Sequence, residues 1–363
     1  MRDRLWRGQD GRAMRLFGHV PCFVSDRVSM SGPSNNLRAE NRVTTNRSVS
    51  GRDTEDGIES LHDHGDGRPG IPRMQPRNVS TMPMSAPALT ARAFGITDKG
   101  KVRTSNEDQF LIAELTKSMR VRQTSLTEPK MQVGEERAHL FVVADGMGGH
   151  RAGEQASGLA VVAIEQFTLN TFKWFLGSTG SDTQKVLAQF QSAIVQADAR
   201  ILEEAAAHPE LNGMGTTVTM AFNLGAQLYV VHVGDSRAYL YRNGQLDQIT
   251  QDHTVTAEMV RSGALRPDEA AGHRLRHAIT NVVGGHELGV TAEAHALDVQ
   301  PGDRLLLCSD GLTEMVSNDA IAAALHAEPS SERAATMLIS QAIEAGGRDN
   351  VTVLIVRFDL AET

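Results

Sequence analysis

Apolar runs of strand length recur along the chain from about residue 91 onward. Each run holds five to eight residues and is bounded by glycine, asparagine or charged residues, which is the pattern of short β-strands separated by turns. The turns Asn223-Leu224-Gly225 and Asn243-Gly244 indicate that the strands beside them pair antiparallel. The runs predict strands over residues 92–97, 109–113, 140–144, 216–222, 226–233, 237–242, 304–309 and 351–358.

Four longer stretches place their apolar residues at helical spacing instead. In the first of them Leu159, Val162 and Phe167 fall on one helical face. Such stretches are typical of amphipathic helices that cover a sheet. They predict helices over residues 155–176, 183–207, 317–327 and 331–345.

Two segments have a weaker pattern. Residues 254–272 show a charged helical pattern that contains Gly263 and Pro267, so we expect a flap over about 252–285 that moves against the sheets. Residues 116–138 are polar and unpatterned, which predicts a long surface loop or a hairpin.

The first 88 residues show no sustained strand or helix period. They are rich in Arg, Ser, Asn, Asp and Gly and are interrupted by prolines, a composition that cannot bury enough apolar surface to fold. We therefore expect a disordered tail over 1–88 and one folded domain over 91–359. Two alternatives stay open: the tail binds an acidic partner through its arginines, or synthesis begins at Met82 or Met84.

The net charge of −8 is unevenly distributed. Residues 1–90 hold 13 Arg, no Lys and 10 acids, whereas residues 91–363 hold 23 Lys and Arg against 34 acids, a net charge of −11. An acidic domain argues against a nucleic-acid partner, which needs a basic surface. It also repels a phosphate ester unless bound metal ions reverse the local charge.

The two cysteines and the hydropathy of the chain bear on its location. Cys22 lies in the expected tail and Cys308 in an expected buried strand, so we expect no disulfide and a reducing compartment, the cytoplasm. No run approaches the ~20 apolar residues of a membrane helix, and the start of the chain is too polar for a secretory signal. We therefore expect no membrane partner.

The stretch His139 to Glu154, HLFVVADGMGGHRAGE, is the most informative part of the sequence. A buried strand delivers Asp145 into a run of glycines, which let the backbone approach a small ligand closely. By itself, Asp-Gly is more typical of a hairpin turn. Two further apolar runs, however, also end in an aspartate, Asp235 and Asp310, and Asp349 directly precedes the last strand.

These four carboxylates predict a cation site. In an antiparallel sheet the end of one strand lies beside the start of its neighbour, so all four can meet at one rim. Carboxylate ligands suit Mg²⁺ or Mn²⁺, and His/Cys clusters with zinc spacing are absent from the sequence. Two such ions can lower the pKa of a bridging water and stabilise an in-line displacement.

Six motifs in order resemble a known family. They are Arg103-x-x-Asn106-Glu107-Asp108, Asp145-Gly146-Met147-Gly148-Gly149-His150, Gly215-Thr216-Thr217, Val233-Gly234-Asp235-Ser236-Arg237, Ser309-Asp310-Gly311-Leu312 and Arg348-Asp349-Asn350. The set resembles the metal-dependent protein serine/threonine phosphatases of the PP2C (PPM) family in their bacterial form, over residues 91 to about 359. The resemblance implies an α+β fold, a four-layer α-β-β-α sandwich of two antiparallel sheets flanked by helices.

The resemblance also implies roles for these residues. Asp145 would bridge two metal ions, and the Gly146 carbonyl, Asp310 and Asp349 would complete their protein ligands. Glu107 and Asp108 would orient metal-bound waters, Arg103 would hold the substrate phosphate, and Asp235 with Asp310 would bind a third ion near the flap.

Other interpretations stay open for several of these residues. Glu107 could coordinate metal directly, and Arg103 could form a structural salt bridge. Asp235 could have a purely structural role, bonding the turn that follows it. We expect His150 to be structural, the Thr216-Thr217 pair to pack in a strand, and Cys308 to lie in the core.

The sequence departs from the family pattern at two positions. Met147 stands where some members carry a histidine that acts as a general acid, so no side chain is assigned that role and a metal-bound water is the simplest proton donor. Asn281 stands where bacterial relatives usually have an arginine, which affects the expected substrate preference rather than the chemistry.

The expected function is hydrolysis of phosphoserine and phosphothreonine on proteins by metal-activated water, in opposition to a Ser/Thr kinase. One alternative is a non-catalytic phosphoprotein-binding scaffold on the same fold, which would be expected to have lost at least one of Asp145, Asp310 and Asp349. Another is a metal-dependent nuclease, which the acidic domain disfavours. A cysteine-dependent phosphatase is excluded because neither cysteine has an arginine six positions later.

Overall fold

The computed structural model describes residues 89–119, 132–149, 151–171, 183–270, 272–285 and 289–361. The predictions for residues 1–88 and for His150 lie outside this part of the chain. The strands are β1 (Leu89–Asp98), β2 (Asp108–Met119), β3 (Gln132–Met147), β4 (Gly215–Thr216), β5 (Val218–Leu224), β6 (Gln227–Val233), β7 (Arg237–Arg242), β8 (Gln245–Gln248), β9 (Val283–Gly284), β10 (Glu293–Asp298), β11 (Arg304–Cys308) and β12 (Val351–Leu360). The helices are α1 (Arg151–Thr171), α2 (Thr183–Ala207), the 3₁₀ helix η2 (Pro209–Leu211), α3 (Val255–Arg261), α4 (Pro267–Ala270), α5 (Asp310–Thr313), α6 (Asn318–Ala327) and α7 (Ser331–Glu344).

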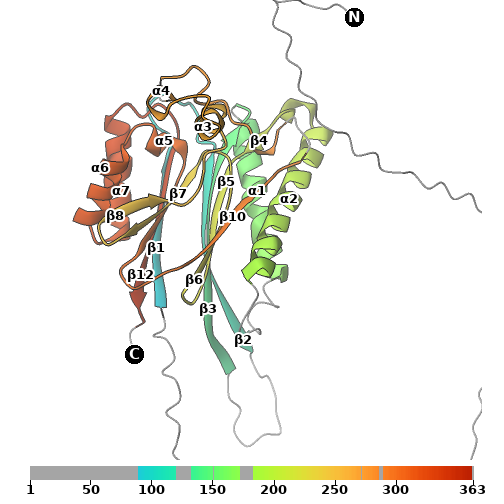
Figure 1. The fold of residues 1–363 in the computed structure, drawn as a ribbon. Helices are drawn as coiled ribbons and strands as arrows, with labels where there is room; N and C mark the ends of the chain where they lie inside the picture. The colour runs from blue at the N-terminus through green and yellow to red at the C-terminus, as the bar shows by residue number, and fades with distance from the viewer. Residues whose placement is uncertain are drawn as a thin grey trace, which may run out of the picture. The chain divides into compact units, whose positions relative to one another are not determined.

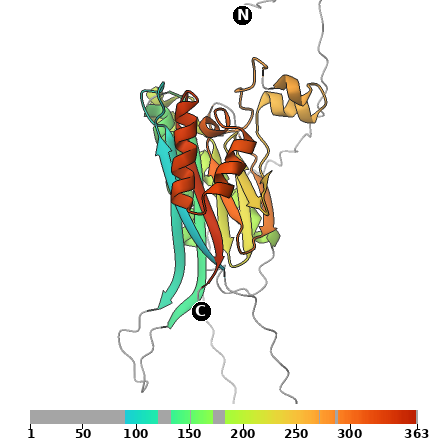
Figure 2. The same cartoon turned by 90° about the vertical axis from the view of Figure 1, so that its left-hand side faces the viewer.

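The described strands form two antiparallel sheets. One has the order β1-β12-β11-β7-β8, and the other has the order β10-β6-β5-β3-β4-β9 with β2 paired to β3. Helices α6 and α7 cover the first sheet, and α1 and α2 cover the second (Figure 1; Figure 2). The four-layer α+β sandwich expected from the sequence is confirmed. None of the described helices combines the length and apolar character needed to cross a bilayer.

The alternation of side chains along β3 explains the layering. Leu140 and Val142 belong to the core beneath α1 and α2, whereas Phe141 and Val143 belong to the core between the two sheets. Successive strand residues point to opposite faces, so a strand that is buried on both faces has a continuous apolar sequence. A third core lies beneath α6 and α7.

The described parts of the polar segment 116–138, residues 116–119 and 132–138, are strand, and their antiparallel pairing confirms the hairpin alternative. Strand β2 continues to Met119 and β3 begins at Gln132, and the two pair along their length with one register irregularity. Strands β8, β9 and β10 were not predicted from the sequence. Two of these are very short, and β10 is only half-buried or exposed along its length and carries polar residues, so no apolar run marks them.

Candidate metal centre

Four carboxylates meet in one pocket of about 360 Å³. Asp145 comes from the end of β3, Asp235 from the turn between β6 and β7, Asp310 from the start of α5 after β11, and Asp349 from the residues before β12. The antiparallel pairing of β11 with β12 brings Asp310 and Asp349 to the same rim. The predicted convergence of these side chains is therefore present in the structure, and Gly146 and Arg103 line the same pocket.

The backbone of Asp145 is fixed by β4 and the residue that follows it. Strand β3 runs past Asp145 to Met147 and pairs with β4, so the hairpin-turn interpretation of Asp145-Gly146 is wrong. The Asp145 amide donates to Thr217 Oγ1 at 3.0 Å, and Thr216 Oγ1 donates to the Asp145 carbonyl at 2.8 Å. The threonine pair does more than pack, because it holds the peptide groups on both sides of the Asp145 Cα.

Gly146 and Gly153 allow β3 and α1 to approach each other closely. A Cβ atom on Gly146 would lie 2.2 Å from the Gly153 carbonyl oxygen, and one on Gly153 would lie 2.0 Å from Glu107 Oε2. Only glycine fits at either position, because other side chains would displace backbone or a buried carboxylate. The same approach places the buried Glu107 beside the start of α1.

Asn350 connects the loop after β1 to the last strand. Its Nδ2 donates to the carbonyls of Lys99 and Ser105, both at 2.9 Å, and its Oδ1 accepts from the Glu107 amide at 2.9 Å. The neighbouring Asp349 accepts a hydrogen bond from Arg103 Nη2 at 2.6 Å. The first and last motifs of the sequence thus form one hydrogen-bonded unit at the pocket.

Asp108 lies behind the pocket rather than in its lining. It is 2% exposed and sits opposite Asp145 in the β2–β3 pair. Its Oδ2 accepts from Ser309 Oγ at 2.8 Å and from Thr352 Oγ1 at 2.7 Å. Asp108 therefore joins β2 to the end of β11 and to β12, beneath the residues predicted to bind metal.

Burial and mutual repulsion raise the pKa values of the buried carboxyls Asp145, Asp310 and Asp108. For Asp145 burial is the largest cause, and the charges of Asp108 and Asp310 add to it. Burial is also the first cause of the raised pKa of Asp310, followed by the charge of Asp235. The pKa of Asp108 rises to about 6, because burial outweighs its hydrogen bonds from Thr352 and Ser309. Cations bound among these groups would remove the repulsion.

The side chains of the pocket fit divalent cations. The ligands on offer are carboxylate and carbonyl oxygens, which Mg²⁺ and Mn²⁺ prefer. Oδ1 of Asp310 and Oδ1 of Asp108 are buried, and no donor within the described ranges reaches either atom. A buried acceptor without a donor is unfavourable, and a cation in the pocket would satisfy the Asp310 oxygen.

Two titratable residues of the pocket were not singled out in the sequence. His277 comes from the predicted flap and Glu314 from the residue after α5, and His277 Nδ1 lies 2.5 Å from Glu314 Oε1. With Asp310 they form a group whose ligand atoms all lie within 4.8 Å of one another. No family motif includes either position, and only the fold brings the flap to α5. Asn281, by contrast, lines neither this pocket nor the neighbouring one and donates to the Thr291 carbonyl at 2.6 Å.

Cys308 is a free thiol in the core, as expected. It is fully buried, and burial raises the pKa of its thiol to about 12. A thiol with this pKa is protonated at neutral pH and is not a nucleophile.

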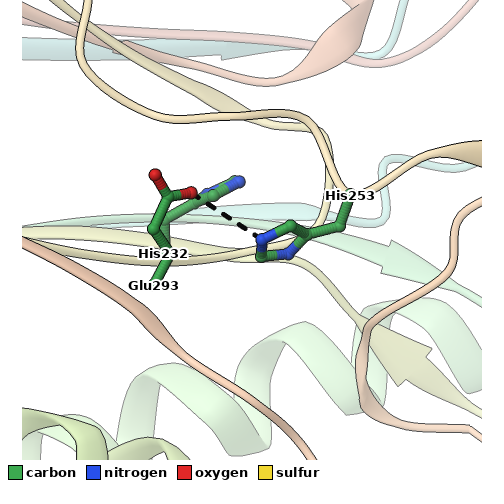
Figure 3. A group of neighbouring side chains, drawn as sticks. All are labelled: His232, His253 and Glu293. Carbon is green, nitrogen blue, oxygen red and sulfur yellow. Dashed lines mark ion pairs between the residues drawn. The ribbon is translucent and has the colours of Figure 1, made fainter. Parts of the chain in front are cut away.

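The turn that carries Asp235 is held by two histidines. Gly234 has a φ of +110°; its amide donates to His253 Nδ1 at 3.1 Å, and its carbonyl accepts from His232 Nε2 at 3.0 Å and from the His253 amide at 2.8 Å. Figure 3 shows His253 facing Glu293, with 3.7 Å between Nε2 and Oε2.

This histidine group is structural rather than a metal site. His232 Nδ1 also has a partner, Thr219 Oγ1 at 2.9 Å, so both ring nitrogens of His232 are occupied. Burial lowers the pKa of His232 to about 3 and also lowers that of His253. Both rings are therefore neutral at pH 7. His253 also accepts a hydrogen bond at its carbonyl from the Thr280 amide at 2.8 Å, which ties the turn before Asp235 to the segment predicted as a flap.

Replacing His253 with alanine should loosen the turn before Asp235. Alanine removes His253 Nδ1, which accepts from the Gly234 amide. The buried amide is then left unpaired, which costs about 1–3 kcal/mol. Asparagine places an amide oxygen near the position of Nδ1, so His253→Asn should keep most of the stability. Thermal unfolding of the two variants measures the difference. Equal melting temperatures for His253→Ala and the unsubstituted protein would contradict this role.

Comparison with known proteins gives a consistent result. The family model for protein phosphatase 2C matches residues 122–343. The chain is 35% identical to the serine/threonine protein phosphatase PstP of Mycobacterium tuberculosis, over 77% of this chain and 48% of PstP. It is 32% identical to the serine/threonine phosphatase stp of Listeria monocytogenes, over 73% of this chain and 95% of the relative. The chain thus spans about half the length of the first relative and nearly all of the second.

Solved structures show the same similarity. The crystal structure of the M. tuberculosis phosphatase PstP superposes with a TM-score of 0.60 at 34% identity, over 74% of this chain and 99% of that one. The catalytic domain of PstP in complex with two manganese ions gives a TM-score of 0.57 at 34% identity, over 75% and 99% of the two chains.

Proposed function

The chain belongs to the protein phosphatase 2C family, and we propose that it is a metal-dependent phosphatase acting on phosphoserine and phosphothreonine in proteins. The observation that carries the proposal is the pocket in which Asp145, Asp310 and Asp349 meet. The relatives named as serine/threonine phosphatases support the substrate class. A non-catalytic scaffold is disfavoured because all three acids are retained.

The metals we propose are two Mn²⁺ or Mg²⁺ ions, with a third beside Asp235 and Asp310. When bound, they would supply an activated water and neutralise the phosphoryl oxygens. Asp145, Asp310, Asp349 and the Gly146 carbonyl would hold the first two. The relative solved with two manganese ions supports this count.

The protein side chains would position and hold the substrate. Arg103, whose side chain is 52% exposed, uses one N–H for Asp349 and has further donors for a phosphate. Glu107 is a buried residue of the pocket lining, Asp108 is buried behind it, and both would orient metal-bound waters. The predicted flap contributes His277 to the pocket and would cover the bound peptide.

We also propose a cellular setting. The substrate class implies a Ser/Thr kinase whose products the enzyme dephosphorylates. The buried thiol of Cys308 is compatible with the reducing cytoplasm.

Hydrolysis of a phosphothreonine peptide tests the proposal. Purified protein should release phosphate with Mn²⁺ and should stop when EDTA is in excess over the metal. Phosphate release that is unaffected by EDTA, or its absence from a folded sample supplied with Mn²⁺, would refute the proposed function.

Arg103→Ala should weaken substrate use more than it weakens the fold. We expect kcat/KM for the peptide to fall by about 10- to 100-fold, because a charge-assisted, two-pronged contact to phosphate is lost. Arg103→Lys should recover part of the loss, since a lysine keeps the charge without the planar fork. Initial-rate kinetics with both variants measure this. An unchanged kcat/KM in Arg103→Ala would assign Arg103 to a structural salt bridge with Asp349 instead.

A further inference from the structure

A second pocket of about 440 Å³ continues from the metal centre. Asp235, His277, Asp310 and Glu314 line both pockets, so the two share a boundary at these residues. A peptide whose phosphoresidue occupied the first pocket would therefore place neighbouring residues in the second.

The other residues that line the second pocket come from segments that are far apart in the sequence. Its flap side is formed by residues of and around α3 and α4, and its other side by residues next to α5 and before β12. Apart from charged residues, this lining consists of hydroxyl and apolar side chains, namely Thr254, Thr256, Ala257, Ala270, Thr313 and Met315.

The charged residues of this lining divide into paired and unpaired groups. Arg237 is held by Asp252, with Nη2 at 2.6 Å from Oδ2. Arg276, from the flap, and Arg348, beside the metal centre, have side chains that form no ion pair or hydrogen bond with the described residues, and both are exposed. Outside the shared boundary, the unpaired charges of this pocket are thus both positive.

We propose that the second pocket binds acidic residues of the substrate next to the phosphoserine or phosphothreonine, through Arg276 and Arg348. The inference rests on the proposed function and narrows its substrate class to phosphoproteins with acidic flanking sequence. Arginine suits this role because its fork of donors matches a carboxylate.

The net charge of the whole domain predicts the opposite peptide preference to the one that we propose. Residues 91–363 carry a net charge of −11, and a field of this sign disfavours an acidic peptide. Without a dedicated site, the enzyme should prefer neutral or basic flanking residues. A preference for acidic residues therefore requires local cations at the pocket.

Two matched phosphothreonine peptides test the inference, one with glutamate and one with glutamine at the flanking positions. With Mn²⁺ and low salt, kcat/KM should favour the glutamate peptide by about threefold to tenfold, the size expected of two exposed ion pairs. The double variant Arg276→Gln, Arg348→Gln should bring this ratio close to one. Arg333→Gln, an equal charge change on α7 at a 71% exposed side chain, should leave the ratio as it is. The preference should appear as a difference in KM. It should shrink when the salt concentration is raised about tenfold, to about 0.5 M, because salt screens exposed ion pairs.

The outcomes separate this inference from the proposed function. Equal use of both peptides, or a glutamate preference that survives in the double variant, overturns the acidic subsite and leaves the phosphatase standing. Fluorescence anisotropy with the Asp145→Asn protein measures peptide binding without turnover. In one outcome neither peptide is hydrolysed, but the glutamate peptide binds more tightly than the glutamine peptide, and this difference disappears in the Arg276→Gln, Arg348→Gln variant. The subsite then stands and the proposed function fails. Equal binding of both peptides overturns the subsite.

Discussion

Asp145→Asn should strongly reduce metal-dependent hydrolysis and at the same time raise the melting temperature of the metal-free protein. The two effects have one cause. Asp145 lies among Asp108, Asp310, Asp235 and Asp349, and burial together with their charges raises its pKa. A carboxyl whose folded pKa is raised lowers the stability of the folded state once the pH passes its ordinary value of 3.8. At pH 7.5 the neutral amide removes that penalty.

The two magnitudes can be measured separately. Loss of a group that stabilises charge in the transition state reduces kcat by about 10²–10³-fold. The gain in stability should shift the metal-free melting temperature upward by about 2–4 °C, which corresponds to ~1 kcal/mol in a domain of this size. In addition, Mn²⁺ should stabilise the variant less than it stabilises the unsubstituted protein.

A matched control uses a carboxylate away from the pocket. Asp247 lies in β8, is exposed and lines neither pocket, so Asp247→Asn should leave both hydrolysis and the Mn²⁺ effect unchanged. A metal-free Asp145→Asn protein that melts below the unsubstituted one would contradict the electrostatic account of the site.

Asp108→Ala should be the most destabilising single change near the site. Ser309 Oγ and Thr352 Oγ1 both donate to Asp108 Oδ2, and alanine would leave two buried hydroxyls without this acceptor. Each unsatisfied buried group costs about 1–3 kcal/mol, so a loss of about 2–4 kcal/mol is expected. Denaturant unfolding of the metal-free protein measures it.

Asp108→Asn separates this structural role from the effect on metal binding. Its amide oxygen can still accept from the hydroxyls, and the repulsion with Asp145 disappears, so stability should be largely kept. Affinity for Mn²⁺ or activity should nevertheless fall by about 10- to 100-fold, as is usual when a group supporting metal ligands is replaced. Equal stability of the alanine and asparagine variants would show that the two hydroxyls find other acceptors.

Much of the fold was predictable because the central strands are buried on both faces. Strand β3 has a continuous apolar run for this reason, and α2 has the predicted bounds because its apolar period is uninterrupted. The polar ends of β2 and β3 and the half-exposed strand β10 were not predictable, since they have no such run. Pairing with a neighbouring strand stabilises them instead.

The acids of the candidate site were predictable from the strand pattern, and Arg103 and Gly146 from the family resemblance. Asp145, Asp235, Asp310 and Asp349 each stand at a strand end or start, and antiparallel pairing is enough to bring them together. The contact between His277 and Glu314 depends on how the segment between α4 and β9 folds against α5, which no local pattern encodes. The threonine hydroxyls that hold Asp108 and Asp145 likewise come from residues far away in the sequence.

Anomalous scattering from crystals soaked in Mn²⁺ would test the central claim most directly. The account predicts at least two manganese peaks in the pocket, in contact with Asp145, Asp310 and Asp349, and their loss in Asp145→Asn crystals. A protein that hydrolyses phosphothreonine peptides with Mn²⁺ but binds no manganese at these three residues would contradict the account.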